Sequence, residues 1–246
     1  MISPPVKLKP EDLIFFENED YIIAKKPFGL LSEEDPAGSV NLRKLLEDYL
    51  HECYPKKKQL ICQLANRLDK PVGGLLFCAK KQSILKDLQE KFFKRKISKY
   101  YLAVVEGVPK KPKAFLENYL VKSSSEFRAI AASPDTPGVK LARLRYELIS
   151  TQDNYSLLKI QIFTGKFHQI RFQLSSLGHP IWNDEWYGAK RMDPRIHIGL
   201  YSYFLGFDDT KTGIRKEYQC LPDLIEPWNL FQSEWIALLE KVTESN

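Results

Sequence analysis

The sequence of 246 residues contains no hydrophobic stretch long enough to cross a membrane. A membrane-spanning helix needs about 18 successive apolar residues, and lysine or another polar residue interrupts each apolar run of this chain. The first five residues lack the basic and then apolar pattern of a secretion signal. Glycine (12) and proline (15) stay near ordinary levels, which excludes collagen-like and low-complexity chains. These absences predict a soluble, cytoplasmic, globular protein.

Cysteine is scarce, and its spacing excludes the common cysteine-based sites. The four cysteines occupy positions 53, 62, 78 and 220, without a Cys-x-x-Cys pair. That spacing suits neither a zinc site nor a dense disulfide framework. Cys62 and Cys78 lie in apolar segments, where we expect reduced thiols packed as small hydrophobic residues.

Charge and size set wide limits on the partner and on the number of domains. The chain has 37 Lys+Arg against 31 Asp+Glu, which gives a net charge of +6. A slightly basic protein is common, so this charge favours a polyanionic partner only modestly. A mass of 28.6 kDa is enough for one large domain or two small ones with a substantial core.

Hydrophobic periodicity predicts strands and helices in mixed order. Period-two alternation, as at 144–148 and 158–162, is typical of antiparallel strands with one face on the core. Because strands and helices do not alternate regularly, we expect a mixed α+β domain with a largely antiparallel central sheet and flanking helices. Further strands are expected at 21–24, 74–80 and 101–105, and helices at 42–49 behind an N-cap at Ser39, at 81–96 and at 170–177.

Two segments lack a clear period and are interpreted from composition. Segment 108–140 has six lysines and arginines and four prolines, and we expect a long loop or an insertion between strands. Segment 226–241 carries two tryptophans and several leucines, and we expect a terminal helix packed on the core.

One charged loop could carry chemistry. Arg67 and Asp69 precede the double glycine at 73–74, which leads into an apolar strand. A carboxylate on a tight loop beside a buried strand can be tuned as a nucleophile by desolvation and by nearby cations. The alternative is an ordinary surface ion pair, and for an isolated Arg-x-Asp that alternative is the more frequent one.

Two further segments combine polar groups at the end of an element. At 164–171 a strand leads into a helix, where free backbone N–H groups together with Lys166, His168 and Arg171 could bind an anion. The alternative is a capped helix with a structural His168. The strand at 99–104 carries paired tyrosines, which are most often packing residues in a sheet.

In their order and spacing, these segments resemble the RluA-type RNA pseudouridine synthases. The resemblance extends from Phe16 to Phe207 and is most specific at His-Gln-Ile-Arg, 168–171. It implies a pseudouridine synthase fold in one catalytic domain over 1–246, with a core at about 16–207, a C-terminal extension at 208–246 and no N-terminal S4 domain. The matching motifs are Lys26-Pro27-Phe28-Gly29-Leu30-Leu31, Arg67-Leu68-Asp69, Gly74-Leu75-Leu76, Lys99-x-Tyr101-x-Ala103, Thr164-Gly165-Lys166-x-His168-Gln169-Ile170-Arg171 and Gly178-His179-Pro180-Ile181-x-x-Asp184-x-x-Tyr187-Gly188.

The resemblance also implies roles for individual residues. Asp69 falls on the catalytic aspartate, the nucleophile or base that acts on the target uridine. Tyr101 falls on the tyrosine that stacks on the flipped base, and Arg171 on the partner of the catalytic carboxylate. Arg67 helps to hold the RNA, and Leu200 shapes the pocket wall. Four further residues are expected to bind substrate or RNA: Lys99, Lys166, His168 and Gln169.

The family uses no metal and no organic cofactor. The implied partner is RNA, either a tRNA or an rRNA. The resemblance also implies a monomer that does not associate with a membrane. A basic run (Lys91, Lys94, Arg95, Lys96 and Lys99) is expected to contact RNA phosphates. Two other functions stay open. One is an RNA-binding protein or RNA chaperone that has lost catalysis, and the other is an enzyme of a small phosphorylated metabolite.

This sequence departs from the family pattern at positions that flank the implied active site. Asn66 stands where relatives have histidine, and Val72-Gly73 where they have Thr-Ser. Tyr201-Ser202 replaces His-Ala, and Asn183 replaces a glycine. These departures bear on substrate preference and on the geometry of the Asp69 loop.

Overall fold

The fold is built on one mixed β-sheet, seen in the computed structural model, which describes residues 8–57, 59–123, 125–192 and 197–235. The sheet has the strand order β1-β2-β4-β10-β5-β9-β8-β6-β7, with β3 paired to β4 and β11 paired to β10. Its strands are β1 (Ile14–Glu17), β2 (Tyr21–Lys26), β3 (Gln63–Leu64), β4 (Gly73–Ala79), β5 (Ser98–Glu106), β6 (Lys113–Lys122), β7 (Ala129–Ala131), β8 (Lys140–Gln152), β9 (Tyr155–Ile162), β10 (Leu200–Asp208) and β11 (Arg215–Gln219).

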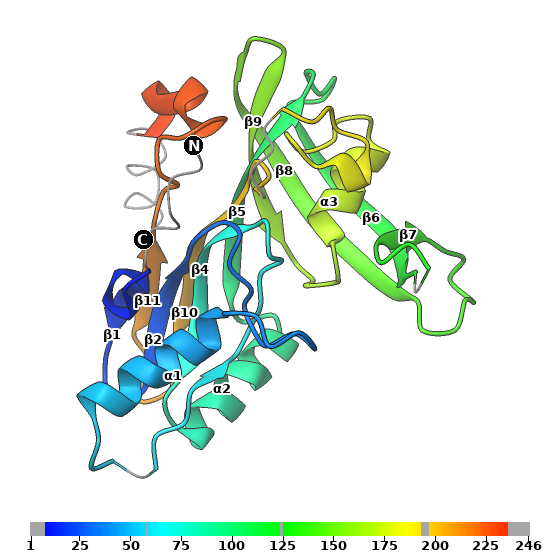
Figure 1. Cartoon of the computed structure of the whole chain (residues 1–246). Coiled ribbons are helices and arrows are strands. Elements are labelled where there is room, and N and C mark those ends of the chain that lie inside the picture. Colours follow the sequence, from blue (N-terminus) through cyan, green and yellow to red (C-terminus); the bar gives the residue numbers. More distant parts are fainter. Residues whose placement is uncertain (1–7, 58, 124, 193–196, 236–246) are drawn as a thin grey trace.

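Neighbouring strands are antiparallel, except that β4 and β10 run parallel. This confirms the expected α+β class with a largely antiparallel sheet. The helices are α1 (Leu42–Cys53), α2 (Gln82–Phe93) and α3 (Gln169–Ser176), with short 3-10 helices η1 (Pro10–Leu13), η2 (Glu185–Tyr187) and η3 (Trp228–Glu234). Figure 1 shows α1 and α2 beside the half of the sheet that contains β2, β4 and β10, and α3 beside β6 and β7.

The core lies between the helices and the central strands. All seven residues of β4 are buried, since other strands flank it on both edges and helices cover it. Helix α1 buries Leu42, Leu46 and Leu50, and each such side chain contributes about 1.5–3 kcal/mol by leaving water. Cys62 and Cys78 are buried free thiols with their sulfur atoms 3.4 Å apart, as expected for small hydrophobic residues.

Three expectations from the sequence need correction. Segment 108–140 is not a loop, because it contains β6 and β7, and β6 pairs with β8 from Lys113 to Leu120. The lysines and prolines of this segment obscured the alternating burial of β6. Helix α1 is capped by Asn41, whose side chain accepts from the backbone N–H of Lys44, whereas Ser39 bonds to Asp35. The terminal helix is the 3-10 helix η3, and positions 236–241 lie outside the described residues.

No helix within the described ranges combines the length and the apolar character that a membrane span requires. Strand β11 belongs to the expected C-terminal extension, yet it pairs with β10 and continues the central sheet.

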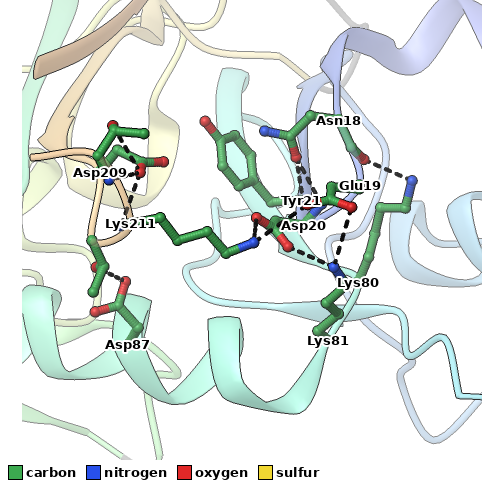
Figure 2. A network of polar contacts seen from close by, with 11 residues as sticks. Asn18, Glu19, Asp20, Tyr21, Lys80, Lys81, Asp87, Asp209 and Lys211 are labelled. Atoms are coloured by element: carbon green, nitrogen blue, oxygen red, sulfur yellow. Dashed lines mark hydrogen bonds and ion pairs between the residues drawn. The ribbon is translucent and has the colours of Figure 1, made fainter. Parts of the chain in front are cut away.

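A network of ion pairs connects three turns at one end of the sheet (Figure 2). They are the β1–β2 turn, the β4–α2 turn with Lys80 and Lys81, and the β10–β11 turn. Asp20, in the turn between β1 and β2, accepts from Lys81 at 2.8 Å and from Lys211 in the turn between β10 and β11. Lys80 donates to the Asn18 carbonyl at 2.8 Å. Burial raises the pKa of Asp20, but the hydrogen bonds from Lys211 and Lys81 outweigh it and lower that pKa below its usual 3.8.

We expect Asp20→Asn to destabilise the fold at neutral pH by about 1–3 kcal/mol, because the charged hydrogen bonds from Lys81 and Lys211 to the carboxylate are lost. A lowered carboxyl pKa stabilises the folded state above the unfolded pKa, and this contribution disappears as the pH falls through the folded pKa. Urea unfolding at a series of pH values measures this, with exposed Glu19→Gln as the matched control. A gap between variant and wild type that stays constant down to about pH 2 would contradict the linkage.

Candidate active site

One cavity of about 450 Å³ brings together the sequence segments that were expected to form the site. It lies between the 65–72 loop, β5, the start of β10 and the turn from β9 into α3. All nine residues predicted for the site line it: Arg67, Asp69, Lys99, Tyr101, Lys166, His168, Gln169, Arg171 and Leu200.

Arg171 is held between two carboxylates. Its Nε and Nη2 donate to the two oxygens of Asp184 at 2.7 and 2.8 Å, which is the planar bidentate arrangement. Its Nη1 reaches Asp69 Oδ2 at 3.4 Å. Asp184 therefore fixes the guanidinium and aims the remaining nitrogen at Asp69. Sequence reasoning did not predict Asp184 as a site residue, although it stands in the last motif.

The Asp69 side chain lies on the cavity wall and is 31% exposed. Desolvation raises the pKa of Asp69, while the positive charges of Arg171, Lys26 and Arg67 act in the opposite direction. A carboxylate that has lost part of its hydration is a stronger base and nucleophile than one in water. Its surroundings thus suit chemistry on a bound substrate.

His168 is neutral and connects Arg171 to the sheet through hydrogen bonds. Burial and the charge of Arg171 lower the pKa of His168 to about 3, so the ring stays uncharged. Its Nε2 accepts from Arg171 Nη1 at 2.9 Å, which leaves the proton on Nδ1 for Tyr187 Oη at 3.0 Å. The Tyr187 hydroxyl in turn accepts from the Ala129 N–H of β7 at 2.7 Å. His168 takes the left-handed conformation (φ 49) that the sharp entry to α3 requires.

Apolar side chains form the remaining walls. Tyr101 lies in β5 opposite Ser202 of β10 and is 7% exposed. Burial raises the pKa of Tyr101 to about 12, so its ring is a neutral wall facing the cavity. Leu200, 3% exposed, begins β10. The structure therefore places both residues where the resemblance implies a pocket for a flat base.

The cationic side chains around the cavity differ in exposure and in ion pairing. Arg67 is 72% exposed and pairs with Glu33 at 3.1 Å. Burial and the neighbouring charge of Lys166 lower the pKa of Lys99 to about 8. Of the basic run, only Lys99 lines the cavity, whereas Lys91 and Lys94 pair with carboxylates of α2.

Gln169 stabilises the turn before α3. Its Oε1 accepts from the Thr164 hydroxyl at 2.7 Å and from the Lys166 N–H at 3.1 Å. Its Nε2 donates to the Arg143 carbonyl at 2.9 Å. The Lys166 backbone N–H is thus used internally, which weakens the expectation of an anion site made by the backbone of this turn.

Lys26 is a buried cation that sequence reasoning treated only as part of a motif. It has no solvent exposure and donates to the carbonyls of Leu30 at 2.6 Å, Pro27 at 3.1 Å and Lys70 at 3.2 Å. Burial lowers the pKa of Lys26 to about 7, and the charge of Asp69 opposes that shift. Lys26 therefore ties the Asp69 loop to the end of β2. The available signal was a lysine at the end of an apolar strand.

The departures from the family pattern have local explanations. Gly73 and Tyr201 are paired across β4 and β10, and a Cβ at Gly73 would lie 3.0 Å from the Tyr201 and Phe28 rings. The large Tyr201 thus leaves little room for a side chain at position 73. Asn183 takes the left-handed conformation (φ 63), which glycine and asparagine adopt most readily, and donates to the His197 carbonyl at 2.8 Å. Asn66 accepts from the Phe77 N–H at 2.9 Å.

We expect Gly73→Ser to destabilise the protein by about 1–3 kcal/mol, because the added atoms overpack the Tyr201 and Phe28 rings. Adding Tyr201→His should recover most of the loss, since the smaller ring vacates that space. The check is the urea midpoint of the two single variants and the double variant. Independent, additive effects of the two substitutions would show that the pair is not coupled.

Within the described part of the chain, no group of three or more His, Cys, Asp or Glu side chains is arranged to hold a metal ion.

Comparisons with known proteins agree with this geometry. Residues 20–176 match the family model described as RNA pseudouridylate synthase. The chain is 30% identical over 245 residues to ribosomal large subunit pseudouridine synthase D of Borreliella burgdorferi, covering 94% of this chain and 73% of that protein. It is 28% identical over 243 residues to ribosomal large subunit pseudouridine synthase C of Haemophilus influenzae, covering 96% and 70%.

Solved structures show the same fold. Human RNA Pseudouridylate Synthase Domain Containing 1 superposes with a TM-score of 0.71 at 20% identity, covering 94% of each chain. The motifs, the sheet and the family match converge on one assignment: the chain belongs to the RluA-type RNA pseudouridine synthases, which are isomerases of RNA.

Proposed function

We propose that the protein converts uridines of ribosomal large-subunit RNA to pseudouridine, with Asp69 as the residue that acts on the base. The observation that carries this proposal is the desolvated Asp69 carboxyl beside Arg171 in a cavity walled by Tyr101. The choice of RNA rests on two relatives that align along nearly the whole chain, both of them ribosomal large subunit pseudouridine synthases.

The reaction sets clear demands on the site. The N1–C1′ bond breaks, the uracil rotates, and a C5–C1′ bond forms while the proton leaves C5 and N1 gains one. A stacked base cannot rotate, so the uridine must leave its helix and enter the cavity. There the Tyr101 ring offers a face for stacking, Asp69 acts as nucleophile or base, and the charge of Arg171 favours the ionised form of the carboxylate.

Two alternatives are less well supported. A protein that only binds RNA has no use for a desolvated carboxylate facing a polyanion, yet Arg171 and Asp184 position Asp69 inside the cavity. An enzyme of a phosphorylated metabolite would need free backbone N–H donors at 164–169, but Gln169 accepts the hydrogen bond of the Lys166 N–H.

The continuous sheet supports one catalytic domain, as the resemblance implies.

The test is an unmodified transcript of large-subunit ribosomal RNA incubated with the purified protein, followed by sequencing that locates pseudouridine. We expect modification at a small number of uridines. A transcript that is bound but left unmodified would favour the non-catalytic RNA-binding alternative, and a transfer RNA modified in its place would redirect the choice of substrate.

Lys99 should make RNA binding depend on pH. Because burial and the Lys166 charge lower the pKa of Lys99 to about 8, the ammonium is present below that pH and lost above it. We expect weaker RNA binding as the pH rises through 8, with the slope of log affinity against log salt falling by about 0.7–0.9, one phosphate contact. Lys99→Arg should remove this dependence, since a guanidinium stays charged. An arginine variant with the same pH dependence as wild type would exclude Lys99 as its source.

A further inference from the structure

A second cavity of about 500 Å³ adjoins the active-site cavity. The two share four lining residues, Asp69, Phe167, His168 and Arg171. The other walls of the second cavity come from the loop between β6 and β7, from the 3-10 helix η2 and from the residues before β10. Its size lies in the range of small-ligand pockets, about 300–1,000 Å³. Three of its lining residues, Asp69, His168 and Arg171, were predicted for the site, whereas none of the residues that line the second cavity alone was predicted.

Exposed aromatic rings gather around this second cavity. Phe127 is 64% exposed, Trp186 55% and Phe167 39%. The contrast with the other tryptophans is sharp, because Trp182, Trp228 and Trp235 are at most 8% exposed. Neighbouring large apolar side chains left in water around one hollow are typical of a binding surface.

Hydrogen bonds join the backbone segments that carry Phe127 and Trp186. Arg128, next to Phe127, donates from Nη1 to the Trp186 carbonyl at 2.9 Å, which joins the β6–β7 loop to η2. One residue further on, Ala129 donates to Tyr187 Oη at 2.7 Å. The same Tyr187 hydroxyl bonds to His168, and His168 accepts from Arg171. The second cavity and the active site are thus parts of one hydrogen-bonded frame.

The charges around the second cavity suit a nucleotide. Lys122 Nζ lies 4.9 Å from the centre of the Phe167 ring, and Lys70 and Arg191 also line the cavity. The three acidic lining residues already have cationic partners, Asp69 and Asp184 with Arg171 and Glu185 with Arg191. Aromatic faces for a base, bordered by cations for phosphate, form the usual platform for an unpaired nucleotide.

We propose that this cavity is a second nucleotide subsite, in which Trp186 and Phe127 stack on an unpaired base that neighbours the target uridine. The inference rests on the proposed function, since it takes the first cavity as the place of the flipped uridine. The shared wall at Phe167, His168 and Arg171 requires the second base to lie close to the first along the RNA strand.

The exposed position of Trp186 makes the subsite observable by its own fluorescence. The probe is a five-nucleotide RNA with one uridine flanked by adenosines, and a second set replaces each neighbour of the uridine in turn by an abasic sugar. We expect the intact probe to quench tryptophan emission in wild type but not in Trp186→Phe. We expect Trp186→Ala to weaken binding of the intact probe by about 5- to 150-fold, the range for one stacked base.

A cycle of protein and RNA changes separates stacking from a general effect on the fold. The effect of Trp186→Ala should vanish on the probe that lacks the stacked neighbour, whereas Trp186→Phe should keep most of the affinity because its ring still stacks. Phe127→Ala should behave like Trp186→Ala. The matched control is Phe15→Ala, an exposed aromatic residue of β1 at the opposite edge of the sheet, which should bind as wild type.

Failure of the subsite and failure of the proposed function have different signatures. Affinities of Trp186→Ala and Phe127→Ala within two-fold of wild type, or losses that persist unchanged on the abasic probes, would overturn the subsite even if the wild-type protein forms pseudouridine. A wild-type protein that forms no pseudouridine but shows the expected quenching and cycle would overturn the proposed function and support the nucleotide subsite.

Discussion

Replacing Arg171 by alanine should lower turnover at least a hundred-fold while leaving RNA affinity within a few-fold. The guanidinium faces Asp69 at 3.4 Å, and removal of a preorganised charge from a water-poor site costs about 10²–10³ in rate. Arg171→Lys should recover only part of the activity, because an ammonium cannot grip Asp184 with two parallel bonds and also reach Asp69.

The same substitution should also destabilise the fold, because Asp184 is buried and would lose its partner. Breaking a buried pair costs about 3–5 kcal/mol, and the Asp184 side chain is only 1% exposed. Adding Asp184→Asn to Arg171→Ala removes the stranded charge and should restore stability without restoring turnover. A double variant that regains activity together with stability would show that Arg171 serves the fold and not the reaction. Single-turnover kinetics and urea unfolding of the three variants supply both readouts.

Asp69→Asn should abolish pseudouridine formation without weakening the fold. Desolvation raises the pKa of Asp69, so at neutral pH the folded state carries this carboxylate at an energetic disadvantage. A neutral amide of the same shape relieves that disadvantage, and we expect a melting temperature equal to or above that of wild type. Binding of RNA should persist, because the surrounding cations Lys99, Lys166 and Arg67 stay in place. A marked fall in melting temperature would indicate a structural aspartate.

Much of the sheet could be predicted from local patterns. Alternation identified β8 and β9, because buried residues alternate with less buried ones along 142–147 and 158–162. Strand β6 obeys the same rule, yet it lies in a segment rich in lysine and proline, whose composition suggested a loop. Its partner β8 supplies the backbone hydrogen bonds, and a pairing between distant segments is not visible in local composition.

Site residues that stand in recognisable motifs could be predicted from the sequence. Residues that only position another site residue were missed. Asp69, Tyr101 and Arg171 were implied by the resemblance, and the fold brings them to one cavity. Asp184 and Tyr187 escaped prediction because their role depends on the orientation of Arg171 and His168, which the sequence does not show.

Lys26 escaped prediction for another reason. Lysine is rarely buried, and the three backbone carbonyls that satisfy this one come from two separate loops. Gly73 and Tyr201 illustrate a similar limit. Each residue differs from the family pattern, and the sequence does not show that the two are neighbours. The pairing of β4 with β10 places the large Tyr201 ring against the residue that has no side chain.

The most direct test of the central claim is tritium release from large-subunit ribosomal RNA labelled at uridine C5, measured for wild type and Asp69→Asn at equal concentration of folded protein. Formation of the new C5–C1′ bond expels the label, so release reports the reaction itself. We predict release by wild type over several turnovers and none above background by Asp69→Asn, with both proteins binding the RNA. Multiple turnovers by pure Asp69→Asn, or no release by wild type, would contradict an RNA isomerase that acts through Asp69.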